Sequence, residues 1–191
     1  MDAKAKLRTG LRNIRRAHVE AMPGSTRALL FKIPPAPLRE TIPAGATIGL
    51  YRATAFEAPA TPYARYFMEN GYRVALPWFE HKGAAMDFRL WTDPFGESDL
   101  TIGPFGLMQP ADDAAAAVPD VLFAPLLGFT ASGDRLGQGG GHYDRWLADH
   151  PGTDVIGMAW DAQLLDELPT EPHDKPMRAV VTPTRIYGPF A

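Results

Sequence analysis

The 191-residue sequence contains no cysteine. This absence excludes a disulfide framework, a thiol nucleophile and any thiolate metal site. The chain also has no apolar run near the roughly 18 residues that a membrane span needs, and its first residues lack the apolar core of a signal peptide. We therefore expect a cytoplasmic protein without a membrane partner.

The composition is that of an ordinary soluble domain. Hydrophobic residues make up 46% of the chain and charged residues 21%. The length fits one hydrophobic core, so we predict a single domain over residues 1–191. The formal charge is only −3, but residues 1–30 are basic and the remainder is acidic. This distribution argues against an extended nucleic-acid surface and fits a smaller anion such as a nucleotide.

The basic start of the chain has a helical pattern. Apolar residues recur at helical spacing before the break at Pro23-Gly24, which predicts a helix over about residues 2–21. Its cations lie on one stripe beside the apolar stripe: Lys4, Arg8, Arg12 and Arg15. Two interpretations stay open, because such a stripe is either a solvated helix face or a set of cations that overlooks the domain's own surface.

Strand and helix patterns alternate through the rest of the chain. Thr47–Arg52 and Tyr72–Leu76 are typical of strands and Pro62–Asn70 of a helix, which together predict a βαβ unit. The nearly continuous apolar run Asp120–Phe129 predicts a strand buried on both faces. Three more elements are predicted, a helix near 142–149 and strands at 154–159 and 179–182. We expect an α/β fold, a single three-layer domain with a mainly parallel sheet flanked by helices.

A glycine-rich loop precedes the helix near residue 142. It comprises Arg135, Leu136, Gly137, Gln138, Gly139, Gly140, Gly141, His142, Tyr143 and Asp144. Glycines let backbone N–H groups approach one anion, and the following helix start favours a phosphate. The loop lacks the lysine of a Walker A motif, and His142 stands where a dinucleotide motif needs its third glycine. An ordinary tight turn remains the alternative, and Asp144 is either a helix-capping carboxylate or a Mg²⁺ ligand.

Three blocks resemble the 5-formyltetrahydrofolate cyclo-ligase family. They are Lys4-Ala-Lys-Leu-Arg8, the segments Pro125–Phe129 and Arg135–Arg145 taken together, and His173-Asp174. The resemblance implies an α/β enzyme that uses ATP and Mg²⁺ to cyclise 5-formyltetrahydrofolate to 5,10-methenyltetrahydrofolate, with release of ADP and phosphate. Its partners would be two small molecules, ATP and a reduced folate. We expect a monomer or a weak oligomer.

The resemblance also assigns roles to residues. Lys4 and Arg135 would be catalytic, Asp144 and Asp174 would bind Mg²⁺, and Glu57 would bind the folate. The ATP contacts would be Lys4, Ala5, Lys6, Leu7, Arg8, Arg135, Leu136, Gly137, Gln138, Gly139, Gly140, Gly141, His142 and Tyr143. Glu57 has a chemical rationale as well, because a carboxylate accepts paired hydrogen bonds from the amino and ring N–H groups of a pterin. Candidates for an aromatic wall, unless they are plain core, are Tyr51, Trp78, Phe79 and Trp91.

Four positions depart from the family pattern: Arg52, Ala60, His142 and Arg178. They support an alternative hypothesis, a nucleotide-binding paralogue with an altered or lost folate substrate. A third hypothesis, a nucleic-acid-binding basic helix, rests only on residues 4–16 and requires steeply salt-dependent binding.

Overall fold

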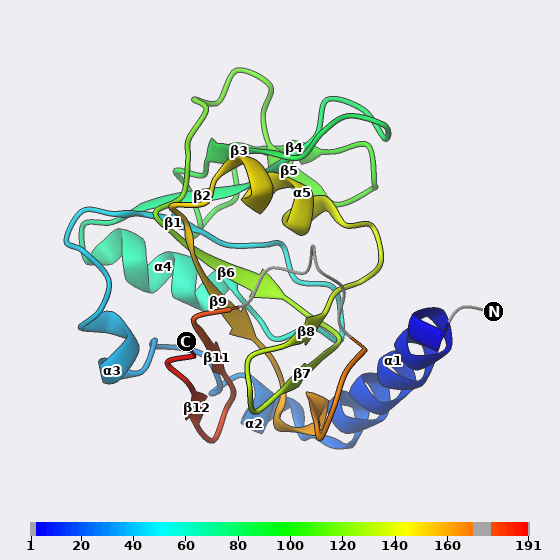
Figure 1. The fold of residues 1–191 in the computed structure, drawn as a ribbon. Helices are drawn as coiled ribbons and strands as arrows, with labels where there is room; N and C mark the ends of the chain where they lie inside the picture. The colour runs from blue at the N-terminus through cyan, green and yellow to red at the C-terminus, as the bar shows by residue number, and fades with distance from the viewer. Residues whose placement is uncertain (1–2, 170–176, 191) are drawn as a thin grey trace.

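A seven-stranded sheet runs through the molecule in the order β12-β11-β9-β6-β1-β2-β3 (Figure 1). The computed structural model describes residues 3–169 and 177–190. The strands from β11 to β2 are parallel, whereas β12 and β3 pair antiparallel at the two edges. The strands are β1 (Thr47–Gly49), β2 (Arg73–Trp78), β3 (Asp87–Leu90), β6 (Val121–Pro125), β9 (Asp154–Met158), β11 (Ala179–Val181) and β12 (Ile186–Tyr187).

Helices connect these strands and cover the sheet. The first, α1, begins at Ala3 and ends at Ala21, which confirms the basic helix expected at the start of the chain. The others are α2 (Gly24–Arg27), α3 (Ala36–Arg39), α4 (Thr61–Glu69), α5 (His142–Asp149) and the 3-10 turn η1 (Asp161–Gln163). Within the described ranges, none is both long and apolar enough to cross a bilayer.

Side chains of the central strands alternate between two buried clusters. Val121 and Phe123 of β6 pack in the cluster that contains the buried side chains of α4. Leu122 and Ala124 point to the opposite face, where they pack in the cluster that contains Trp146 of α5. Both faces of the sheet are therefore covered, which explains why its central strands are apolar throughout. The predicted α/β fold, with a mainly parallel sheet flanked by helices, is confirmed.

The predicted βαβ unit is β1, α4 and β2. Gly71 follows α4 with a φ of 82°, a left-handed conformation that glycine adopts without a Cβ clash and that ends the helix. β1 is shorter than the sequence indicated, since it ends at Gly49. Beyond it, the amide of Leu50 still donates to Ala75 O at 2.9 Å before the chain leaves the sheet.

The apolar segment Asp120–Phe129 is not one strand, and here the sequence-based prediction was wrong. β6 ends at Pro125, and the chain then enters the hairpin of β7 (Gly128–Thr130) and β8 (Arg135–Leu136), with β10 (Leu164–Leu165) beside β7. Gln163 Nε2 holds the bend by donating to Leu126 O at 2.7 Å and Leu127 O at 3.1 Å. Because its carbonyls are satisfied by this side chain, the segment is able to leave the sheet while remaining buried.

Candidate active site

One cavity of about 590 Å³ lies where β1, β2 and β6 end, between α1, the glycine-rich loop and the ribbon of β4 (Leu100–Ile102) and β5 (Met108–Pro110). Ligands collect at this edge of an open parallel sheet, where neighbouring connections leave in opposite directions. Most of the residues predicted from the sequence meet here: Lys4, Arg8, Glu57, Arg135, Leu136, Gly137, Gln138, Gly139, Gly140, Gly141, His142, Tyr143 and Asp144.

Three residues predicted to contact ATP lie outside this lining. Leu7 packs against the small cluster of Leu11, Leu127 and Leu136, and Lys6 is exposed. Ala5 is half-buried and does not line the cavity either. Their spacing on α1 explains this, because residues between Lys4 and Arg8 face other directions around a helix. Nucleotide contact by these three residues stays a prediction.

The basic stripe of α1 packs on the glycine-rich loop. Arg8 Nε donates to Gly137 O at 3.1 Å, and Arg12 Nη2 donates to Gln138 O at 3.0 Å. Lys4 and Arg15 are buried, with 9% and 6% of their surface exposed. The interpretation of this stripe as a solvated helix face is therefore wrong. The cations overlook the domain's own surface, and Arg8 and Arg12 hold the loop.

The loop itself presents backbone N–H groups at the start of α5. Gly139 has a φ of 106° and Gly141 a φ of 61°, both in the left-handed region that glycine tolerates best. Gly141 is also the N-cap of α5, and no side chain caps this helix end. The first amides of α5 are thus available to an anion in the cavity, and the helix dipole favours negative charge there.

Arg135 and Asp144 form an ion pair between β8 and the first turn of α5. The Arg135 side chain is only 5% exposed and its Nε has no hydrogen-bond partner within the described part of the chain. Asp144 does not cap α5, so that interpretation of its carboxylate is wrong. An orphaned guanidinium N–H beside a glycine loop is a donor that a phosphate oxygen would satisfy.

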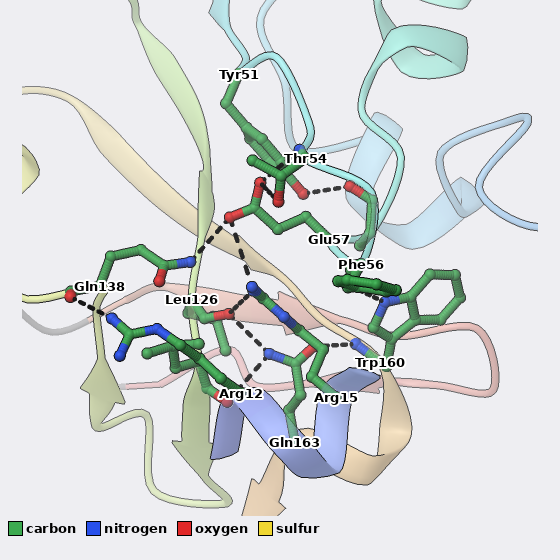
Figure 2. Close-up of polar contacts among 12 residues, drawn as sticks. Arg12, Arg15, Tyr51, Thr54, Phe56, Glu57, Leu126, Gln138, Trp160 and Gln163 are labelled. Atoms are coloured by element: carbon green, nitrogen blue, oxygen red, sulfur yellow. Dashed lines mark hydrogen bonds and ion pairs between the residues drawn. The ribbon is translucent and has the colours of Figure 1, made fainter. Parts of the chain in front are cut away.

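The carboxylate of Glu57 is held by three side chains and one backbone amide (Figure 2). Oε2 accepts hydrogen bonds from Thr54 N at 2.8 Å and Thr54 Oγ1 at 2.9 Å. Oε1 accepts one from Gln138 Nε2 at 2.9 Å and lies 3.6 Å from Arg15 Nη1. The side chains of Arg15 and Glu57 are each 8% exposed. The Glu57 carboxylate therefore lies in the wall of the cavity with its negative charge balanced by Arg15.

The loop that carries Glu57 is supported by Trp160, the N-cap of η1, and by Gln163 of η1. Trp160 Nε1 donates to Phe56 O at 3.0 Å, and Trp160 N donates to Gln163 Oε1 at 2.8 Å (Figure 2). Because Gln163 also holds the bend after β6, Trp160 and Gln163 together link the Glu57 loop to the sheet edge. Tyr51 OH adds a hydrogen bond of 2.6 Å to Ala58 O. Glu57 is therefore preorganised by fixed neighbours.

Two tyrosines near Glu57 keep their protons. Burial raises the pKa of Tyr51 well above its ordinary value, and the neighbouring Glu57 raises it further. Burial and Glu57 also raise the pKa of Tyr143, while Arg135 opposes that shift. Burial lowers the pKa of His142, and the nearby Arg145 lowers it further. These phenols are neutral hydrogen-bonding groups, and the imidazole favours its neutral form.

The far end of the cavity is apolar. Phe79, Phe105 and His142 pack edge to face, with ring centroids 4.9 Å apart for the two phenylalanines and 5.0 Å for Phe79 and His142. Of the predicted aromatic candidates, Tyr51 and Phe79 line the cavity, whereas Trp78 and Trp91 do not. Sequence reasoning missed Phe105, Leu107 and Met108, which the β4–β5 ribbon supplies. The apolar residues that follow the Gly103-Pro104 turn signal were the available sequence signal for this wall.

Of the two predicted Mg²⁺ ligands the structure describes Asp144, whereas Asp174 lies outside the described residues. In the ranges 3–169 and 177–190, no group of three or more His, Asp and Glu side chains is arranged to hold a metal ion. Asp144 engages Arg135 through Oδ1. One carboxylate with phosphate oxygens is nevertheless an ordinary Mg²⁺ environment, so the donor chemistry present fits a nucleotide-bound ion.

Comparison with known proteins identifies the family. A model described as the 5-formyltetrahydrofolate cyclo-ligase family matches residues 1–183. The chain belongs to this family. It is 33% identical over 189 residues to the 5-formyltetrahydrofolate cyclo-ligase of Mycolicibacterium smegmatis, covering 96% of this chain and 95% of the relative. It is 34% identical over 147 residues to the Escherichia coli K12 cyclo-ligase, covering 74% and 80%.

Solved structures with the same fold carry names of the same family of ligases. The NMR structure of Aquifex aeolicus 5,10-methenyltetrahydrofolate synthetase has a TM-score of 0.76 at 22% identity, covering 98% of this chain and 93% of the other. The Mycoplasma pneumoniae 5,10-methenyltetrahydrofolate synthetase has a TM-score of 0.65 at 21% identity, with 94% and 98% covered. These structural likenesses establish the cyclo-ligase fold.

Proposed function

We propose that this cyclo-ligase family member converts 5-formyltetrahydrofolate to 5,10-methenyltetrahydrofolate with ATP and Mg²⁺, releasing ADP and phosphate. The observation that carries the proposal is the joining of two chemically different half-sites in one cavity. One half presents cations and loop amides, and the other presents the Glu57 carboxylate beside an apolar wall. A triphosphate and a pterin need these two environments within reach of each other. We also propose one domain, since both core clusters pack on the same sheet.

The nucleotide half-site consists of Lys4, Arg8, Arg135 and the amides of the glycine-rich loop. Phosphoryl transfer depends mainly on orientation and on cations around the transferred group. Arg135 has the buried, orphaned Nε described above, and Arg8 keeps its guanidinium on the loop through Gly137. We assign Lys4 and Arg135 to neutralising the charge that develops on the phosphoryl oxygens.

Asp144, with Asp174 as the second predicted ligand, would hold Mg²⁺ on the phosphates. When bound, this ion would supply charge neutralisation and orient the triphosphate. The contribution of the chain is to fix the Asp144 carboxylate in the first turn of α5 through its pair with Arg135. We expect Asp144→Asn to raise the Mg²⁺ concentration needed for half-maximal activity by about tenfold, since one charged ligand is lost. A titration of activity against Mg²⁺ measures it, and an unchanged requirement would refute the assignment.

The folate half-site consists of Glu57 and the apolar wall. The carboxylate would accept hydrogen bonds from the amino and ring N–H groups of the pterin, and Phe79 and Phe105 would cover its flat faces. The raised pKa of Tyr143 keeps its hydroxyl protonated, and therefore a hydrogen-bond donor, well above neutral pH. These groups orient the N5-formyl oxygen toward the nucleotide half-site.

The reaction then requires two displacements. The formyl oxygen attacks the γ-phosphorus of ATP, the bond to the bridging oxygen breaks, and ADP leaves. N10 next attacks the activated formyl carbon and loses its proton, and phosphate departs with the former formyl oxygen as the five-membered ring closes. The chain's part is to hold the reactants in line, neutralise the phosphoryl charge and exclude water, so positioning supplies most of the catalysis.

The departures from the family pattern divide into two groups. Ala60 is fully buried as the N-cap of α4, and Arg178 pairs with Asp154 at 3.3 Å and Thr41 at 2.9 Å, so neither lines the cavity. His142 and Arg52 do line it. Arg52 is already paired with Glu97 at 2.6 Å. Only these two residues bear on the alternative of an altered folate substrate.

The proposal is tested by incubating the purified protein with 5-formyltetrahydrofolate, ATP and Mg²⁺. We expect methenyl absorbance to rise in parallel with ADP. A protein that binds ATP tightly but forms no methenyl product, and binds no reduced folate in a calorimetric titration, would instead be the nucleotide-binding paralogue.

Gly139→Ala tests the loop geometry. A Cβ at this position would lie 3.3 Å from Arg8 Nε, and the φ of 106° is unfavourable for alanine. We expect the KM for ATP to rise by about tenfold, from backbone strain and a displaced Arg8. Gly152→Ala is the control, because its Cβ would meet nothing within 4 Å. Equal ATP kinetics for both variants would contradict this role of the loop.

A further inference from the structure

The side chain of Gln138 joins the two half-sites. It belongs to the glycine-rich loop, yet its Nε2 donates to Glu57 Oε1 at 2.9 Å, across 81 residues of sequence (Figure 2). Its backbone carbonyl is held separately by Arg12 Nη2 at 3.0 Å. The amide of Gln138 is therefore free to move without the loop moving, because the backbone and the side chain have different partners.

The Glu57 carboxylate has too few spare acceptor positions for two further N–H donors. A carboxylate offers about four lone-pair sites. Three hydrogen bonds fill three of them, from Thr54 N and Thr54 Oγ1 to Oε2 and from Gln138 Nε2 to Oε1. Arg15 Nη1 lies 3.6 Å from Oε1, within ion-pair distance but beyond a hydrogen bond. A ligand that pairs with Glu57 through two N–H groups must displace at least one of these donors.

Gln138 is the donor that is easiest to displace. Arg15 is buried and also reaches Leu126 O at 3.4 Å, and Thr54 belongs to the same tight turn as Glu57. Gln138 by contrast is exposed and holds Glu57 by a single hydrogen bond from a flexible side chain. Its amide N–H also has the same chemistry as the amino group of a pterin, so it occupies the place that the substrate would take.

We propose that Gln138 is a positioning residue that couples the two substrates. Its amide holds Glu57 Oε1 until the N–H groups of the reduced folate replace it, and the released amide then donates to a phosphate oxygen of the nucleotide on the same loop. Folate binding thus strengthens nucleotide binding, and by linkage the nucleotide strengthens folate binding by the same factor. This inference rests on the proposed function.

Gln138→Met provides the test, because methionine has a similar length and no N–H. We expect this variant to bind 5-formyltetrahydrofolate alone about threefold to tenfold more tightly than the wild type, since no internal hydrogen bond has to be broken. The affinity for a non-hydrolysable ATP analogue should no longer depend on folate. Both affinities are measured by calorimetry on the full chain with Mg²⁺.

Arg12→Met is the matched control, because it loosens the same loop residue without removing the donor to Glu57. It should show no gain in folate affinity. If Gln138→Met binds folate no more tightly than the wild type, or keeps the full dependence of nucleotide affinity on folate, the inference is overturned. Failure of the wild type itself to bind 5-formyltetrahydrofolate would instead overturn the proposed function.

Discussion

Arg135→Ala is expected to lower kcat/KM for ATP by about 100-fold or more, while the affinity for 5-formyltetrahydrofolate changes little. Removal of one preorganised donor to a developing oxyanion costs about this much. In the nucleotide-free protein the change also leaves the Asp144 carboxylate without its ion-pair partner. Steady-state kinetics with each substrate varied in turn measures the effect.

Two further variants separate a phosphate contact from a structural role. Arg145 Nη2 also touches the loop, at Gly140 O, but Arg145 is exposed and does not line the cavity. Arg145→Ala should therefore change ATP kinetics far less. The double variant Arg135→Ala/Asp144→Asn removes the charge left unpaired in the nucleotide-free protein and should regain thermal stability. Its ATP affinity should stay low, because both the guanidinium and a predicted Mg²⁺ ligand are missing. Recovery of ATP affinity in that double variant would show that Arg135 acts only by neutralising Asp144.

Glu57→Gln is expected to raise the KM for 5-formyltetrahydrofolate by about 100-fold, because charge-assisted hydrogen bonds to the pterin are lost. The ATP affinity measured without folate should change much less. The variant should also lower the free energy of unfolding by about 2–3 kcal/mol, since Arg15 is left buried without its carboxylate. Kinetics and thermal unfolding report the two effects separately.

A double variant without either charge separates the effect of losing Glu57 on stability from its effect on folate binding. Arg15→Met/Glu57→Gln replaces the buried pair without leaving a single charge, so stability should recover while folate binding stays weak. Glu20→Gln is the surface control, because the Arg16–Glu20 pair is exposed, with 62% and 52% of the two side chains accessible. Recovery of folate binding in the double variant would show that Glu57 serves only to compensate Arg15.

Local pattern predicted much of the fold. The periodicity of residues 2–21 identified α1, and the order of apolar segments identified the βαβ unit and the parallel sheet, because these signals depend on neighbours in the sequence. Strand boundaries were predicted less well where a side chain from a distant part of the sequence bonds to the backbone of the segment. The single strand expected over Asp120–Phe129 is broken by Gln163, which satisfies two carbonyls from 36 and 37 residues away.

The chemistry of the nucleotide half-site was also present in the sequence. Four glycines, Arg135 and the helix start lie within ten consecutive residues, so the shape of the loop is largely a local property. The basic stripe of α1 was also apparent from the sequence, but the surface that it faces was not. Only the packing of α1 on the loop shows that Arg8 and Arg12 point to Gly137 and Gln138.

The sequence by itself determined the kinds of residue at the site: a glycine loop with cations for phosphate and one carboxylate with a chemical reason to meet a pterin. The tertiary structure decided which groups share that carboxylate. Arg15, Thr54 and Gln138 come from three separate segments, and Phe105 reaches the apolar wall from a ribbon with no family signal. Such contacts depend on how helices and loops pack against one sheet, and packing is not encoded in the spacing of any single segment.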